Sequence, residues 1–234
     1  MKKYLALVMA VLMALTCVAL VACGEEEPCT HNYENGTCTL CGEADPNYVP
    51  EQGGGGANIY TDEEFHGTAL PAGKVYLTTI GQADFAFAET LLTHPTNGAG
   101  YTEATIDYNL TAAEVEDGAI VIAVVGYTAK GLATDITVTG EQDRATAFAT
   151  KAEEGKISLV VLHLGGAGRR GDTSDPMIET MVSVADYTLI YHDVDDNDNG
   201  ADYDGAISGW VTTELYRYAD EMEIVPALKV LLGL

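Results

Sequence analysis

The sequence predicts an α/β domain with a doubly wound, mostly parallel sheet and helices on both faces. Apolar segments that are unbroken or nearly so occur at 119–125 (AIVIAVV), 159–164 (LVVLHL) and 187–191 (YTLIY). Continuous apolar strands are typical of parallel sheets, because helices cover both faces of the sheet. Segments with apolar side chains three and four residues apart, the spacing of a helix, lie between them. This alternation is the pattern of Rossmann-like and flavodoxin-like folds.

The first half of the domain supplies four predicted elements. Residues 75–80 (VYLTTI) predict a strand, and the Gly-Gln pair after it predicts a turn. A helix then follows, with its apolar stripe at Phe85, Ala88 and Leu92. A weaker strand is expected at 104–108. Residues 111–114 (TAAE) have the spacing of a capping box, which predicts a short helix.

The second half continues the alternation. Residues 139–142 (TGEQ) have capping-box spacing, and the helix expected there has its apolar stripe at Ala145, Phe148, Ala149 and Ala152. Asp175 as N-cap and Pro176 at the first helical position predict another helix, with its stripe at Ile178, Met181, Val182 and Ala185. Residues 224–232 are expected to form a last strand, at an edge of the sheet because Pro226 lacks an N–H donor.

The balance of charges excludes one class of partner. The chain of 234 residues has 11 Lys and Arg against 36 Asp and Glu, a formal net charge of −25. Phosphate backbones are bound by clustered Lys and Arg, so nucleic acid is not expected as a partner. A bare anionic membrane surface would also repel the chain. Apolar residues make up 47% of the sequence, so the chain is not disordered as a whole.

The N-terminus has the features of an export signal. Lys2 and Lys3 precede an uncharged apolar run that ends in small residues before Cys23. Residues 1–22 resemble the signal peptide and lipobox of bacterial lipoproteins. The resemblance implies a lipid on Cys23, with the bilayer as partner and the outer face of the cytoplasmic membrane as the location. A transmembrane anchor is the alternative, because 18 apolar residues nearly span a bilayer.

Residues 23–50 contain a cysteine-rich segment. Cys29, His31, Cys38 and Cys41 are two pairs of soft ligands that can close a tetrahedral zinc site. Such a Cys3His knuckle is structural, because four protein ligands leave no open position. The segment resembles the zinc-ribbon-like pieces that follow the lipobox in some Firmicutes lipoproteins. A Cys38–Cys41 or Cys29–Cys41 disulfide is the alternative. Residues 51–57 predict a glycine-rich linker, and the α/β domain then spans 58–234.

The loops after the strands collect glycines and basic residues. The carboxyl ends of strands in open α/β sheets border the ligand crevice, so these loops are the candidate site. Arginine forks and loop N–H groups bind anions. The candidate ligand-binding residues are Gln82, Lys130, Gly131, Arg144, His163, Gly165, Gly166, Arg169, Arg170, Ser174 and Asp175. The arginines could instead only pair with the abundant carboxylates.

These residues carry a resemblance to an uncharacterised bacterial family of exported α/β lipoprotein domains. The similar positions are Gly81-Gln82, Lys130-Gly131-Leu132, Glu141 with Arg144, the HxGGxxRRGxxSD stretch at 163–175, and Asp204-Gly205. The resemblance spans about 74–232 and implies the fold and the pocket. The family is classed as a domain of unknown function, so it implies no activity.

We therefore expect a surface-anchored binding domain for a small anionic ligand or for an anionic group on a cell-wall component. The alternative is a hydrolase or transferase in the same crevice. His163 or Glu141 would be its acid/base, and Arg169 and Arg170 would clamp the anion. The Gly-x-Ser-x-Gly nucleophile elbow is absent, and the glycines match no nucleotide fingerprint, so no nucleotide is predicted. A scaffold whose zinc-like segment binds a protein is a third possibility.

Lipidation at Cys23 is directly testable. Metabolic labelling with a fatty-acid probe is expected to tag the wild-type chain and to spare Cys23→Ala, because the thioether needs the thiol. Equal labelling of both chains would contradict the prediction.

Overall fold

The structure is a computed structural model and describes residues 33–34, 37–38, 58–61, 65–81, 83–128, 136–191 and 207–234. The chain divides into two compact units, residues 1–51 and 52–234. In the first unit, β1 (Tyr33–Glu34) and β2 (Thr37–Cys38) pair antiparallel. The expected signal, the Cys23 lipid site, the linker and the side chains of the proposed zinc ligands lie outside the described residues. Within the described part of the chain, no helix is long and apolar enough to cross a membrane.

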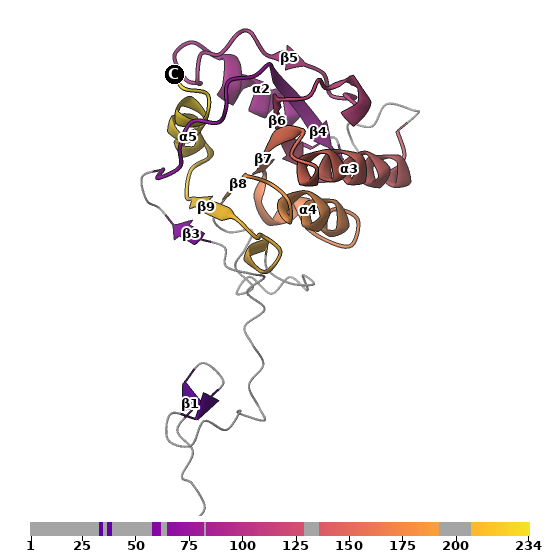
Figure 1. Cartoon of the computed structure of the whole chain (residues 1–234), viewed down its shortest axis with the longest axis vertical. Coiled ribbons are helices and arrows are strands. Elements are labelled where there is room, and N and C mark those ends of the chain that lie inside the picture. The colour runs from indigo at the N-terminus through magenta and orange to yellow at the C-terminus, as the bar shows by residue number, and fades with distance from the viewer. Residues whose placement is uncertain are drawn as a thin grey trace, which may run out of the picture. The chain divides into compact units, whose positions relative to one another are not determined.

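The second unit contains the predicted parallel sheet (Figure 1). Its described residues form seven strands, and every pair of neighbouring strands is parallel. The strand order is β3 (Asn58–Thr61), β9 (Glu214–Tyr218), β8 (Tyr187–Tyr191), β7 (Ile157–His163), β6 (Ala119–Val125), β4 (Val75–Ile80) and β5 (Thr105–Ile106). The doubly wound α/β fold is confirmed.

Helices cover both faces of the sheet. The helices α3 (Val138–Glu153) and α4 (Asp175–Val182) lie side by side on one face, and α2 (Phe85–Thr93) and α5 (Ile224–Leu231) cover the other (Figure 1). Strand β6 shows why its sequence is unbroken: Val121 packs into one core and Ile122 into the other. Successive side chains of a strand point to opposite faces, so a strand buried on both faces needs apolar residues throughout.

The prediction of a last strand at 224–232 is wrong, because these residues form α5. The helical spacing is visible in the buried side chains, which are Ile224, Val225, Ala227, Leu228 and Leu231. Pro226 lies in the first turn, where a missing N–H donor costs the helix nothing. The sequence analysis did not predict β9 or β3. Their residues, ELYRY and NIYT, mix polar and apolar side chains, so neither forms an apolar run.

Two helix starts differ from the predicted ones. The N-cap of α3 is Thr137, whose hydroxyl oxygen accepts the Gly140 N–H at 3.0 Å. Helix α4 includes Asp175 as its first residue, and Ser174 precedes it. The two predicted N-caps, Thr139 and Asp175, therefore lie inside their helices, and the Asp175 carboxylate accepts from Arg170 instead. The short helix η2 (Ala112–Glu114) is confirmed, and the Glu114 carboxylate accepts the Thr111 N–H at 2.9 Å.

The core that α3 shares with the sheet is expected to depend on Phe148, whose side chain is fully buried. Phe148→Ala would leave a cavity that the neighbouring side chains fill only in part, so the free energy of unfolding should fall by about 3–5 kcal/mol. The matched control is Phe87→Ala on α2, because Phe87 is exposed and its loss should cost about 0.5 kcal/mol or less. Denaturant unfolding measures both values, and equal losses would contradict the prediction.

Candidate functional site

The topological switch point of the sheet lies between β4 and β6. Strand β4 pairs with β5 on one side and with β6 on the other, and the chain proceeds from β6 away from β4. In doubly wound sheets the ligand crevice lies outside the carboxyl ends of the two strands where the order reverses. Here those ends lead into the loops at 81–84 and 126–128.

The two loops at the switch point bind each other through their backbones. The Ala83 N–H donates to the Gly126 carbonyl at 3.1 Å, and the Thr128 N–H donates to the Gly81 carbonyl at 2.9 Å. A Cβ atom on Gly81 would lie 2.4 Å from the Gly126 oxygen, and Gly81 has a φ of +88°. Glycine is therefore required at 81 for loop packing, which accounts for this position without a ligand.

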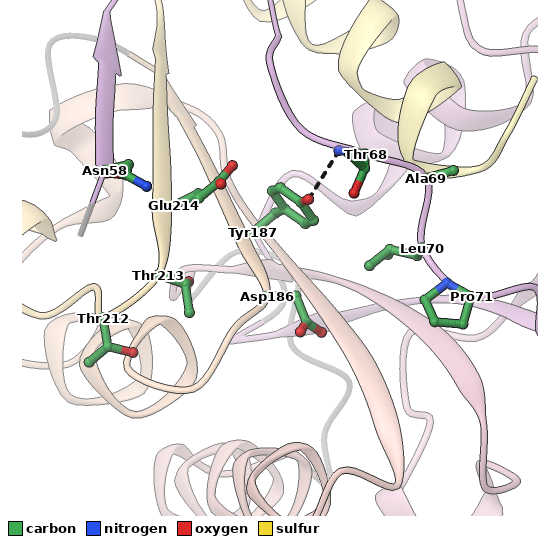
Figure 2. Close-up of a pocket in the computed structure, with 10 residues that line it drawn as sticks. All are labelled: Asn58, Thr68, Ala69, Leu70, Pro71, Asp186, Tyr187, Thr212, Thr213 and Glu214. Carbon is green, nitrogen blue, oxygen red and sulfur yellow. Dashed lines mark hydrogen bonds between the residues drawn. The ribbon is translucent and has the colours of Figure 1, made fainter. Parts of the chain in front are cut away.

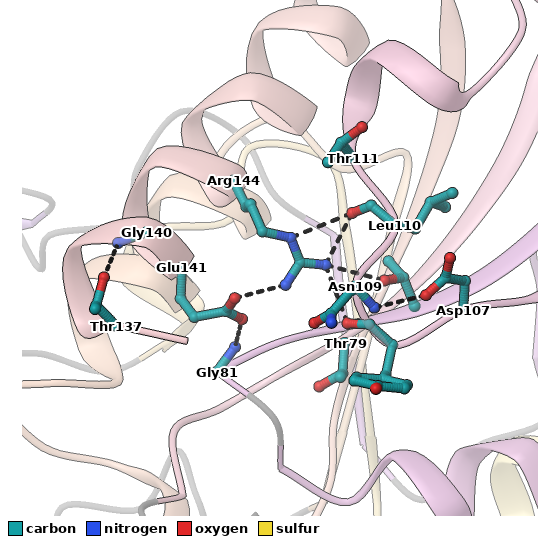
Figure 3. A network of polar contacts seen from close by, with 12 residues as sticks. Thr79, Gly81, Asp107, Asn109, Leu110, Thr111, Thr137, Gly140, Glu141 and Arg144 are labelled. Atoms are coloured by element: carbon teal, nitrogen blue, oxygen red, sulfur yellow. Dashed lines mark hydrogen bonds and ion pairs between the residues drawn. The ribbon is translucent and has the colours of Figure 1, made fainter. Parts of the chain in front are cut away.

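Glu141 and Arg144 of α3 form the most extensive polar network at this edge (Figure 3). The buried Glu141 carboxylate accepts the Gly81 N–H at 2.6 Å and an Arg144 N–H at 2.6 Å. Arg144 also donates to the carbonyl oxygens of Leu110, at 2.9 and 3.2 Å, and of Tyr108, at 3.2 Å. Both charges are thus engaged inside the domain, which disfavours Glu141 as a general base and Arg144 as a ligand-binding group.

Arg169 pairs with Asp84, across the loops that follow β7 and β4. Its Nε and Nη2 groups donate to the two Asp84 oxygens at 3.0 and 3.3 Å, and 32% of its side chain is exposed. A Cβ atom on Gly165 would lie 2.7 Å from Asp84 Oδ2, so glycine at 165 makes room for this pair. Gly166 begins the 3₁₀ helix Gly166–Arg169 that carries the arginine.

The side chain of Arg170 is completely buried and pairs with Asp175 rather than with Asp84. Its Nε and Nη2 donate to the Asp175 carboxylate at 2.8 and 3.3 Å, and its guanidinium lies 5.2 Å from the ring centroid of Trp210. A cavity of about 250 Å³ beside it is lined by Asp172, Asp175, Glu179 and other residues. An acidic wall repels anions, so this arrangement disfavours Arg170 as an anion clamp.

His163, the last residue of β7, is a buried neutral imidazole. Its Nδ1 lies 2.7 Å from the Val125 carbonyl oxygen, which can only accept, so Nδ1 carries the proton. Its Nε2 has no hydrogen-bond partner among the described residues. Burial lowers the pKa of His163 to about 4. A Cβ atom on Gly126 would lie 3.6 Å from its Cε1 and 3.4 Å from the Arg169 Cβ, so imidazole and arginine flank the same glycine.

Of the remaining predicted residues, Ser174 makes a structural contact, and the others lie in segments that the structure does not describe. Ser174 accepts the Tyr127 N–H at 2.9 Å and so joins the loop after β6 to the start of α4. Gln82, Lys130 and Gly131 lie outside the described residues. Sequence reasoning missed Asp84, although an acidic residue in the loop after the first long strand was a usable signal. It also missed Trp210, which lies far along the chain from Arg170.

A family model for a domain of unknown function (DUF6305) matches residues 72–203. The chain belongs to this family. The matched range covers β4 to β8, so it includes the switch point and His163. It also includes Arg144, Arg169 and Arg170. Membership confirms only that the domain belongs to a family classed as a domain of unknown function, and it assigns no reaction. The comparisons with curated proteins and with solved structures found no match.

Apart from the proposed zinc ligands, a metal site was sought among the described residues. Among them, no group of three or more His, Cys, Asp or Glu side chains could hold a metal ion. The proposed zinc ligands are outside this search, because their side chains are not described.

The buried imidazole of His163 is expected to make stability depend on pH. In the unfolded chain its pKa returns to about 6.5, so between pH 6.5 and 4 the unfolded state binds more protons. The free energy of unfolding should therefore be highest above pH 6.5 and lose about 3 kcal/mol from this residue as pH falls through 4. Denaturant unfolding from pH 4 to 7 measures it.

His163→Asn keeps an amide donor and removes the titration, so its pH dependence should be shallower by that amount. A wild-type slope in His163→Asn would show that the residue does not titrate as argued.

Proposed function

We propose that the chain is a membrane-anchored extracytoplasmic domain that binds a small anionic ligand, or an anionic group of a cell-wall component, at the carboxyl ends of the strands. The observation that carries the proposal is the Arg169–Asp84 pair beside the switch point. Among the described arginines of this edge, Arg170 is buried and Arg144 is held by backbone carbonyls. Arg169 is the most exposed of the three, with 32% of its side chain accessible.

The geometry of the pair explains how an anion could bind without unfolding the loop. Asp84 engages Nε and Nη2 of Arg169, and Nη1 has no hydrogen-bond partner among the described residues. Nη1 can therefore donate to a ligand oxygen while the pair stays intact. Neutral His163 lies beside this arginine, but its buried Nε2 offers no exposed acceptor and the ring carries no positive charge at neutral pH. A ligand with a carboxylate or a phosphate fits the Nη1 donor of Arg169.

A hydrolase or transferase in the same crevice is the second candidate, and His163 is the observation that favours it. The Val125 carbonyl fixes its tautomer, which leaves Nε2 as a base of the kind that general catalysis uses. Arg169 would then be the anion clamp. Glu141 and Arg170 are committed to Arg144 and Asp175, so they contribute less to this candidate than the sequence predicted.

The proposed cellular location rests on the N-terminal sequence. The basic start, the apolar run and Cys23 support export and a lipid anchor at the outer face of the cytoplasmic membrane. The pattern of Cys29, His31, Cys38 and Cys41 supports a structural zinc knuckle between the anchor and the domain.

Arg169→Gln is expected to weaken anion binding by one to two decades, because a charge-assisted hydrogen bond is worth about 1.5–3 kcal/mol. Asp84→Asn should act in the opposite direction and strengthen binding, since it removes the carboxylate that competes for the guanidinium. Titration calorimetry of the chain from residue 24 onward, with phosphate, succinate and glutamate as probes, measures both effects.

The matched control is Lys156→Gln, which removes one positive charge from a partly exposed pair with Glu154. It should leave every affinity unchanged. A lower melting temperature in Arg169→Gln with no change in any affinity, or no binding of the three anions to the wild type, would overturn the proposal.

A further inference from the structure

A cavity of about 460 Å³ lies at the edge of the sheet opposite the switch point, and Figure 2 shows the residues that line it. It is bordered by the first residues of three strands, β3, β9 and β8. All strands are parallel, so their amino ends meet at this edge and their carboxyl ends at the other. The cavity is therefore separate from the proposed anion site.

The strand register places polar groups in a row along the cavity. Asn58 of β3 pairs with Glu214 of β9, and Glu214 pairs with Tyr187 of β8. Cross-strand partners project from the same face, so the amide, the carboxylate and the phenol ring line one wall. Asp186 precedes Tyr187 and contributes a second carboxylate.

The opposite wall is a chain segment that is held in place. The Thr68 N–H donates to the Tyr187 hydroxyl at 3.1 Å, as Figure 2 shows, and the Leu70 N–H donates to the Leu231 carbonyl at 2.9 Å. Leu70 and Pro71 give this wall an apolar surface. The cavity is thus formed before any ligand binds, and part of its lining is apolar.

The charge of the cavity is negative. Its described lining includes Asp186 and Glu214 and no Lys, Arg or His. Asp186 Oδ2 accepts the Leu159 N–H at 2.8 Å, and Glu214 Oε2 accepts the Tyr216 hydroxyl at 2.8 Å. The other oxygen of each carboxylate has no hydrogen-bond partner among the described residues. Partial burial raises the pKa of Asp186, because desolvation disfavours its charged form.

We propose that this cavity binds a small organic cation that carries a primary ammonium group. Two carboxylate oxygens can accept its N–H donors, and the Tyr187 ring with Leu70 and Pro71 can pack against its aliphatic part. A bare metal ion fits less well, because two carboxylates and an amide leave most of its ligand positions to water. A neutral polyol would leave both charges uncompensated.

Titration calorimetry of the chain from residue 24 onward with putrescine tests the proposal. 1,4-Butanediol is the matched probe, since it has the four-carbon chain of putrescine with both ammonium groups replaced by hydroxyls. Putrescine is expected to bind and butanediol is not. Asp186→Asn and Glu214→Gln should each weaken putrescine at least tenfold, and both side chains keep an oxygen for their internal donor.

Glu89→Gln, on the exposed surface of α2, removes the same charge elsewhere and should change the putrescine affinity less than twofold. Arg169→Gln should also leave it unchanged, which separates this proposal from the anion site. Three results would overturn the inference: no putrescine binding at millimolar concentration, equal binding of butanediol, or a loss in Glu89→Gln as large as in Glu214→Gln.

Discussion

The buried carboxylate of Glu141 is the interaction on which the carboxyl edge of the sheet depends. It joins α3 to the end of β4 through the Gly81 N–H, and Arg144 extends the connection to the chain between β5 and β6. A buried charge is costly unless it is paired and hydrogen-bonded, and here each charge has the other together with backbone groups. The position of Glu141 in the first turn of α3 adds a favourable interaction with the helix dipole.

Internal partners also hold most polar side chains of the HxGGxxRRGxxSD stretch. Gly165 makes room for the Asp84–Arg169 pair, Arg170 joins Asp175 beside Trp210, and Ser174 holds the Tyr127 N–H. Most of the motif therefore shapes and braces the loops. Arg169 and His163 differ from the rest because one retains exposed surface and the other retains a bare nitrogen. A motif can thus be specific to a family mainly through the framework that it builds.

The predictability of each element follows from how it is buried. Strands β4, β6, β7 and β8 were predictable because continuous burial gives continuous apolar sequence. Helix α5 is short and apolar, so its eight-residue segment resembles a strand until the spacing of the buried side chains is known. The sequence could place the arginines at the correct edge, but Asp84 lies 85 residues from Arg169, and no local pattern reveals such a pair.

The net charge of −25 has opposite effects on the ligands proposed for the two edges of the sheet. It opposes the approach of an anion to Arg169, so selectivity there must come from short-range hydrogen bonds, which salt screens little. It favours the approach of a cation to Asp186 and Glu214, and this long-range part weakens as salt rises. Charge alone therefore cannot define either proposed site. What distinguishes each edge is geometry: a partly engaged guanidinium at one, and two half-satisfied carboxylates at the other.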